Sequence, residues 1–226
     1  MDKIALFDFC ETIVDFQTAD AFCEFVKKHV HSNNYEWKLL RDFLNRTGLV
    51  KIVQLFYKDE YINKKLLLKE INGISKCKME DLGKLYYEKV IKKHFIVEML
   101  GELNRLKTKG YKIYIVSGGY DIYIKHMVRE YGLDGYISTE LLFKNGVFCG
   151  KYVGHDCLGK EKVNRLREYF RITGDITKLD SYSYSDSISD LPFLKFSKKG
   201  IVVSRKIEPT WVKENKLEVF LYGIEK

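Results

Sequence analysis

The stretch ALFDFCETIVDF, residues 5–16, decides how the rest of the chain is interpreted. An apolar run suited to a buried parallel strand leads directly into a carboxylate, Asp8, and Cys10 follows two residues later. A buried strand that ends on an acid indicates chemistry at the carboxyl end of that strand. The cysteine is unexpected, because chemistry at such a place usually uses a second acid.

Length and composition limit the class of protein. The chain has 226 residues, of which 46% are hydrophobic, which fits one large globular domain or a domain with an insertion. Its apolar runs are shorter than the roughly 18 residues of a membrane span, and no signal peptide precedes the first apolar run, so we expect a cytoplasmic protein without a membrane partner. The five cysteines form no C-x-x-C pair, which argues against a disulfide framework and against a zinc site.

The formal net charge is +8, which raises the question of a nucleic-acid partner. The lysines are spread along the chain and form no dense basic run, so we expect a solvated surface and no specific nucleic-acid binding. The positive charge could also attract a small anionic substrate.

Hydrophobic periodicity divides the chain into two parts. Residues 14–95 place apolar residues at helical spacing, which predicts four or five helices. After residue 95, strands alternate with helices, which predicts a parallel sheet with the helical block inserted after its first strand. A hairpin is expected at Asn145-Gly146. The remaining strands are predicted at residues 111–117, 135–139, 181–186, 200–204 and 217–222.

Polar residues follow three of the predicted strands. The first strand ends on Asp8, the second on Ser117-Gly118-Gly119, and the strand SYSYSD on Asp186. Ligands of open α/β sheets bind outside the carboxyl ends of the strands. Three such ends in one sheet predict a common site.

These residues resemble the motifs of the haloacid dehalogenase-like (HAD) superfamily, and most closely those of its phosphoserine-phosphatase-like branch. The four motifs occur in the family's order and span the whole chain. They are Asp8-Phe9-Cys10-Glu11-Thr12 for D-x-D-x-T, Ser117 in IVSGG, Lys160 in GKEKV, and Asp186 with Asp190 in SDSISD. The resemblance implies a Rossmann-like three-layer core with a parallel sheet, residues 1–13 and 96–226, and an inserted helical cap, residues 14–95.

The resemblance also implies roles for the core residues. Asp8 would attack a phosphate monoester and form an aspartyl-phosphate. Ser117 and the amides of Gly118 and Gly119 would donate to the phosphoryl oxygens. Lys160 would neutralise the remaining charge, with Lys162 as the rival lysine.

A magnesium ion is implied as the cofactor, because it prefers oxygen ligands. Asp8, Asp186 and the backbone carbonyl of Cys10 would hold the ion, and Asp190 would hold a ligand water or Lys160. The start of the predicted cap follows the first motif closely enough to face the substrate. The residues expected there are Asp15 and Asp20, with their neighbours Gln17 and Thr18. The same residues could instead begin and cap a helix.

Cys10 departs from the family pattern, in which an acid at this position protonates the leaving group. A thiol is a poor substitute, since its unperturbed pKa is about 8.5. The leaving group could need little protonation, or Glu11 or a cap residue could supply the acid. The sequence therefore predicts a Mg²⁺-dependent phosphatase acting on a small phosphorylated metabolite. A phosphotransferase, a slow enzyme on the same site and a degenerate binding module are the alternatives.

Overall fold

A six-stranded sheet of order β3-β2-β1-β6-β7-β8 forms the centre of the computed structural model, and each neighbouring pair of its strands runs parallel. The structure describes residues 3–30, 34–49, 51, 62–205 and 207–223. The predicted α/β class with a parallel sheet is confirmed. The strands are β1 (Lys3–Phe7), β2 (Lys112–Tyr120), β3 (Gly135–Thr139), β6 (Asp180–Ser185), β7 (Lys199–Arg205) and β8 (Glu218–Tyr222).

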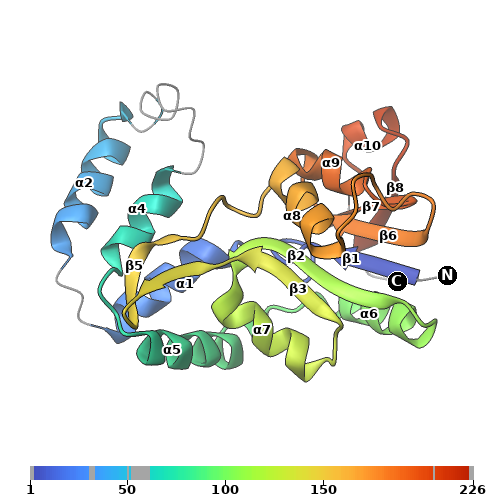
Figure 1. The fold of residues 1–226 in the computed structure, drawn as a ribbon. Helices are drawn as coiled ribbons and strands as arrows, with labels where there is room; N and C mark the ends of the chain where they lie inside the picture. Colours follow the sequence, from blue (N-terminus) through green and yellow to red (C-terminus); the bar gives the residue numbers. More distant parts are fainter. Residues whose placement is uncertain (1–2, 31–33, 50, 52–61, 206, 224–226) are drawn as a thin grey trace.

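Helices cover both faces of this sheet, as Figure 1 shows. Side chains of β1 alternate between the two sides: Ala5 and Phe7 belong to one buried cluster, and Ile4 and Leu6 to the other. This double burial explains why the strand is apolar along its whole length. The covering helices are α6 (Val97–Thr108) and α7 (Asp121–Glu130) on one face, and α8 (Lys160–Phe170) and α9 (Leu191–Leu194) on the other. The short helix α10 (Thr210–Glu214) packs beside β7.

The inserted block is helical, as predicted, and lies to one side of the sheet (Figure 1). A predicted helix at residues 49–61 lies almost entirely outside the described residues, and the predicted domain limits remain a prediction. None of the helices that the structure describes is long and apolar enough to span a bilayer. The described elements of the block are α1 (Thr18–His29), α2 (Tyr35–Arg46), α4 (Ile62–Glu70), α5 (Lys76–Lys89) and the 3₁₀ turn Ile91–Lys93.

A hairpin from the second half of the chain joins this helical block. It consists of β4 (Leu141–Lys144) and β5 (Val147–Tyr152), and its turn has positive φ at Asn145 and Gly146, as the Asn-Gly sequence predicts. The Phe148 N–H donates to Ile74 O at 2.8 Å, and the Gly73 N–H donates to Phe148 O at 3.0 Å. The side of the molecule formed by the helical block, called the cap side below, therefore also contains residues 141–152.

Strand β2 continues past its predicted end at Ser117 as far as Tyr120. Its pairing with β3 shifts register between Ser117 and Tyr120, so the two glycines between them form an irregular segment at the edge of the site. A Cβ atom on Gly118 would lie 2.4 Å from Leu158 Cδ2. Only glycine fits there without displacing that leucine.

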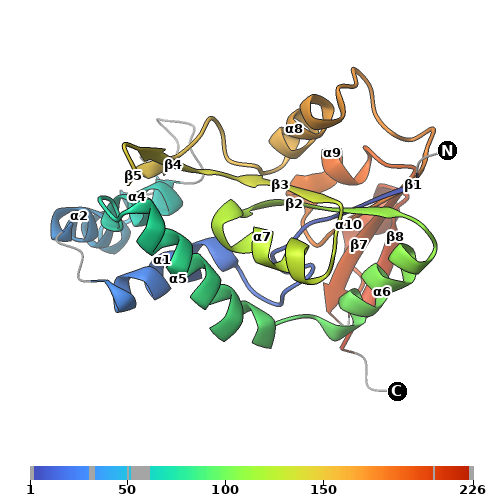
Figure 2. The same cartoon turned by 60° about the horizontal axis from the view of Figure 1, so that its bottom comes forward.

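Helices α5 and α7 make a close contact that positions the cap side against the sheet (Figure 2). A Cβ atom built on Gly83 would lie 2.5 Å from the backbone oxygen of Ile122. Gly101, in the middle of α6, has no atom within 4 Å of the same virtual position.

We expect Gly83→Ala and Gly101→Ala to have opposite effects on stability. Gly101→Ala should raise the free energy of unfolding by up to about 1 kcal/mol, because alanine favours helix over the unfolded chain. Gly83→Ala should lower it by about 1–3 kcal/mol, because the new methyl group forces α5 away from α7. Urea denaturation followed by circular dichroism measures both. A stabilised Gly83→Ala would show that this contact is loose.

Candidate active site

The central strand and its two neighbours bring three predicted site residues to one edge of the sheet. Phe7 of β1 is in register with Ile115 of β2 and with Tyr184 of β6. Asp8, Ser117 and Asp186 follow these positions by one or two residues, so they meet at the carboxyl ends of adjacent strands. The Asp8 N–H still donates to Tyr184 O, at 2.9 Å.

A buried lysine joins two of the predicted acids. Lys162 is fully buried, and its Nζ lies 2.8 Å from Asp8 Oδ1 and 2.5 Å from Asp190 Oδ2. These two carboxylates raise the pKa of Lys162 above its usual value and outweigh the burial that opposes it. Burial raises the pKa of Asp8 to about 6, because the nearby Lys162 offsets only part of the cost of its charge.

The structure corrects the choice of lysine. Lys160 is exposed at the start of α8 and lines a separate surface hollow with Asp175 and Pro192, whereas Lys162 reaches Asp8. Side chains that are two positions apart on a helix point to nearly opposite faces. The signal was present in the sequence, because Lys162 shares the buried face of α8 with Val163 and Leu166.

Asp190 holds this lysine with both of its oxygens engaged. Its Oδ2 accepts from Lys162 and from Ser185 Oγ at 2.7 Å, and its Oδ1 accepts from the Gly159 N–H at 3.1 Å. These contacts favour the positioning of Lys162 over direct metal ligation, so of the two predicted roles of Asp190 the structure favours holding a lysine.

Asp8 and Asp186 form a donor set that fits a hard cation. Burial and the negative charges of Asp8 and Glu11 raise the pKa of Asp186 to about 7, and the positive charge of Lys162 offsets only part of this effect. Thr12 Oγ1 donates to Asp186 Oδ1 at 3.4 Å. The structure shows no cluster of three or more Cys, His, Asp or Glu ligands among its described residues, so a magnesium ion here would also need the Cys10 carbonyl and waters as ligands.

Ser117 is placed to donate a hydrogen bond into the site. It is fully buried, and its Oγ accepts from the Gly119 N–H at 3.1 Å, which leaves its own proton for another acceptor. Gly118 lines the same cavity, with its carbonyl turned to Lys64 at 2.7 Å. Gly119 is predicted to bind phosphate, but it does not line the cavity, because its amide is bonded to Ser117.

Cys10 lines the cavity but belongs to a chain of buried hydroxyl groups. Its Sγ lies 3.1 Å from Thr18 Oγ1, which in turn lies 2.7 Å from Tyr123 OH. Burial, followed by the charge of Asp8, raises the pKa of the Cys10 thiol to about 11. The thiol therefore stays neutral and is poorly suited to exchange protons with a substrate.

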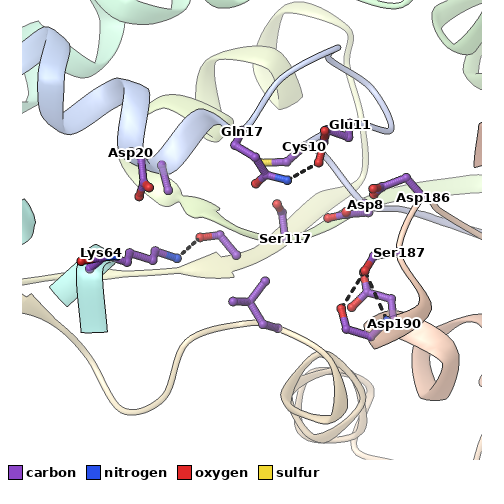
Figure 3. Close-up of a pocket in the computed structure, with 15 residues that line it drawn as sticks. Asp8, Cys10, Glu11, Gln17, Asp20, Lys64, Ser117, Asp186, Ser187 and Asp190 are labelled. Atoms are coloured by element: carbon purple, nitrogen blue, oxygen red, sulfur yellow. Dashed lines mark hydrogen bonds between the residues drawn. The ribbon is translucent and has the colours of Figure 1, made fainter. Parts of the chain in front are cut away.

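A cavity of about 390 Å³ connects the sheet edge with the cap side, and Figure 3 shows its lining. Asp20 and Gln17 line it, as expected of residues that follow the first motif. Asp15 does not: its Oδ1 lies 2.9 Å from His94 Nδ1, away from the cavity. Gln17 Nε2 donates to Glu11, and Thr18 is buried behind Cys10.

Several cavity residues were not foreseen from the sequence. Lys64 reaches the site from α4 and lies on its buried face together with Leu67 and Leu68, a spacing that could have pointed to it. Its Nζ donates to Asp156 Oδ1 at 2.8 Å and Oδ2 at 2.7 Å. No periodicity marks Asp156, which lies in the loop before α8. Asn63, Ser187 and Ser189 also line the cavity.

Comparison with known proteins assigns the chain to a family. The model of the haloacid dehalogenase-like hydrolases matches residues 5–195. This chain belongs to that hydrolase family. The matched segment runs from β1 through α9 and so includes all four predicted motifs.

The curated relatives support the predicted branch, and the solved structures show the same fold. The chain is 26% identical to a phosphoserine phosphatase of Methanocaldococcus jannaschii over 92% of this chain and 87% of that protein. It is 22% identical to a histidinol-phosphatase of Neisseria meningitidis over 92% and 93% of the two chains. A Bordetella pertussis protein superposes with a TM-score of 0.73 at 15% identity, over 97% of this chain and 98% of that one. An intermediate analogue of phosphoserine phosphatase superposes with a TM-score of 0.57 at 19% identity, over 98% and 93%.

We expect Lys162→Met to be strongly destabilising and Lys160→Met to be nearly neutral. The first substitution leaves the buried carboxylates of Asp8 and Asp190 without their cation, a change that typically costs about 3–5 kcal/mol. The second removes an exposed charge and should change the free energy of unfolding by less than about 0.5 kcal/mol. Urea denaturation compares the two variants. Equal effects would contradict the assignment of Lys162 to the site.

Proposed function

We propose that the protein is a magnesium-dependent phosphatase that cleaves a small phosphorylated metabolite through a covalent intermediate on Asp8. The observation that carries the proposal is the arrangement at the sheet edge, in which Asp8 lies between the Lys162 ammonium and the cavity, with Asp186 beside it. Family membership and relatives named as phosphatases support the same reaction class.

In the first step a carboxylate oxygen of Asp8 attacks phosphorus, and the bond from phosphorus to the substrate oxygen breaks. Lys162 holds the Asp8 carboxylate in place and offsets the negative charge of the phosphoryl group. The Ser117 hydroxyl donates a hydrogen bond to a phosphoryl oxygen, since its Oγ already accepts one from the Gly119 N–H. Bound magnesium would supply further positive charge, held by Asp8, Asp186 and the carbonyl of Cys10.

In the second step a water attacks phosphorus, which releases phosphate and restores the Asp8 carboxylate. The first step needs a proton delivered to the leaving substrate oxygen, and the second needs one removed from the attacking water. The Cys10 thiol is too weak an acid for the first of these roles. Glu11 lines the cavity and accepts a hydrogen bond from Gln17. It follows Cys10 directly in the sequence, so it is the first candidate for the acid. Because the Cys10 thiol stays neutral, we expect hydrolysis to be slow. A slowly hydrolysed intermediate could pass its phosphoryl group to an acceptor other than water, and this transfer is the second candidate function.

The nucleophile is tested with Asp8→Asn, which keeps the shape of the side chain and removes the attacking charge. We expect phosphate release from p-nitrophenyl phosphate with Mg²⁺ to fall below about 1% of the wild-type rate, within the scale of covalent catalysis. Wild-type protein treated with EDTA should be inactive until Mg²⁺ is restored. The matched control is Asp15→Asn, outside the cavity, which should keep full activity. Clear turnover by Asp8→Asn would rule out the covalent intermediate.

Cys10→Asp tests whether a missing acid limits the rate. A carboxyl group at this position would lie beside Thr18 Oγ1 and could protonate the leaving oxygen. We expect hydrolysis of alkyl phosphates to increase tenfold or more, within the roughly 100- to 10,000-fold range of acid–base catalysis. The activated aryl phosphate should gain less.

Cys10→Asn is the matched control, since it has nearly the same size and no acid. It should stay close to the wild-type rate. If both variants lose activity, the thiol has a role of its own, and acceptors for phosphoryl transfer become the first compounds to assay.

A further inference from the structure

The cavity has two chemically different ends. Figure 3 shows Asp8, Asp186 and Asp190 at one end, and Asp20 with Lys64 at the other. The first end receives the phosphoryl group in the proposed reaction. The second end, formed by α1 and α4, therefore faces the part of the substrate that leaves.

Lys64 is committed to the protein itself. An ammonium group has three N–H donors, and the Lys64 Nζ lies within hydrogen-bond distance of three acceptors: Asp156 Oδ1 at 2.8 Å, Asp156 Oδ2 at 2.7 Å and Gly118 O at 2.7 Å. Both side chains of this ion pair are nearly buried. Thr139 Oγ1 also donates to Asp156 Oδ1, at 2.6 Å, which fixes the acid in place. The lysine therefore has no donor left for a carboxylate on the substrate.

The next cation beyond the cavity wall is committed as well. Arg41 Nε lies 2.5 Å from Glu70 Oε1, and Arg41 does not line the cavity. Among the described charged side chains that line this end of the cavity, Asp20 is the one without an ion-pair partner.

The Asp20 carboxylate of α1 lines this end of the cavity and makes no hydrogen bond to another described residue. Lys64 and Asp156 offset one another, so among the described residues Asp20 leaves this end of the cavity negative.

We propose that the leaving part of the substrate is cationic and carries no carboxylate: the substrate is the phosphate monoester of an amino alcohol. Its ammonium group binds the Asp20 carboxylate. This proposal rests on the proposed phosphatase function and deepens it. Phosphoserine should be a poor substrate, because its carboxylate would meet this negative wall, where the described residues offer no free cation to bind it.

A set of four substrates tests the proposal on the wild-type protein with Mg²⁺. They are 2-aminoethyl phosphate, its neutral counterpart of equal size 2-hydroxyethyl phosphate, phosphoserine and p-nitrophenyl phosphate. We expect kcat/KM for 2-aminoethyl phosphate to exceed the values for 2-hydroxyethyl phosphate and phosphoserine by about tenfold or more, the effect of one charged hydrogen bond. Equal or higher values for either competitor would overturn the proposal, while hydrolysis of the aryl phosphate would leave the phosphatase function standing.

If none of the four compounds is hydrolysed, the proposed function fails, and binding decides the inference on its own. Titration calorimetry then compares 2-aminoethyl phosphate with 2-hydroxyethyl phosphate. A dissociation constant at least tenfold lower for the amine supports the cationic site, and equal constants overturn it.

Two variants assign the preference to residues. Asp20→Asn should reduce the ratio of kcat/KM between the amine and its hydroxyl counterpart by about tenfold, whereas Asp15→Asn should leave the ratio unchanged. Asp156→Asn should release Lys64 and raise the ratio for phosphoserine over 2-aminoethyl phosphate by tenfold or more. If Asp156→Asn unfolds, Asp20→Asn alone decides, and an unchanged ratio in that variant contradicts the proposal.

Discussion

The site depends on one buried cation between two carboxylates. Lys162 is fully buried, and without Asp8 and Asp190 the cost of removing its charge from water would be prohibitive. The requirement is mutual, because Asp8 is buried at the end of a strand and keeps its charge through the same lysine. Asp190 in turn is held by Ser185 and by the Gly159 amide, so that β6, α8 and the turn after β6 all converge on one ammonium group.

A second buried ion pair, between Lys64 and Asp156, connects the helical block to the core, and its lysine lines the cavity. Lys64 comes from α4, while Asp156 and Gly118 come from core segments. The same contact that joins the two parts also removes a cation from the substrate's reach. If the substrate binds as proposed, this one interaction both joins α4 to the core and keeps Lys64 from binding the substrate.

Much of the core site could be predicted because its determinants are local. Asp8, Ser117 and Asp186 each follow an apolar strand, and parallel strands place their carboxyl ends together. The GKEKV motif offers two lysines, and it is the buried face of α8 that distinguishes Lys162 from the predicted Lys160. Asp15 was assigned to the site from its closeness to Asp8 along the chain, yet the backbone turns it toward His94. The partnership of Lys64 with Asp156 joins residues 92 positions apart, and no local pattern encodes such a contact.

The cysteine and the negative end of the cavity are consistent with one another. An alkoxide is a poor leaving group unless something protonates it, and Cys10 does so badly because burial and Asp8 raise its pKa. An ammonium group two carbons from the leaving oxygen changes this requirement. Its positive charge stabilises the negative charge that develops on that oxygen, so the oxygen can leave with less protonation. A substrate of this kind depends less on the acid that the protein lacks, and Asp20 would hold its ammonium group at the far end of the cavity.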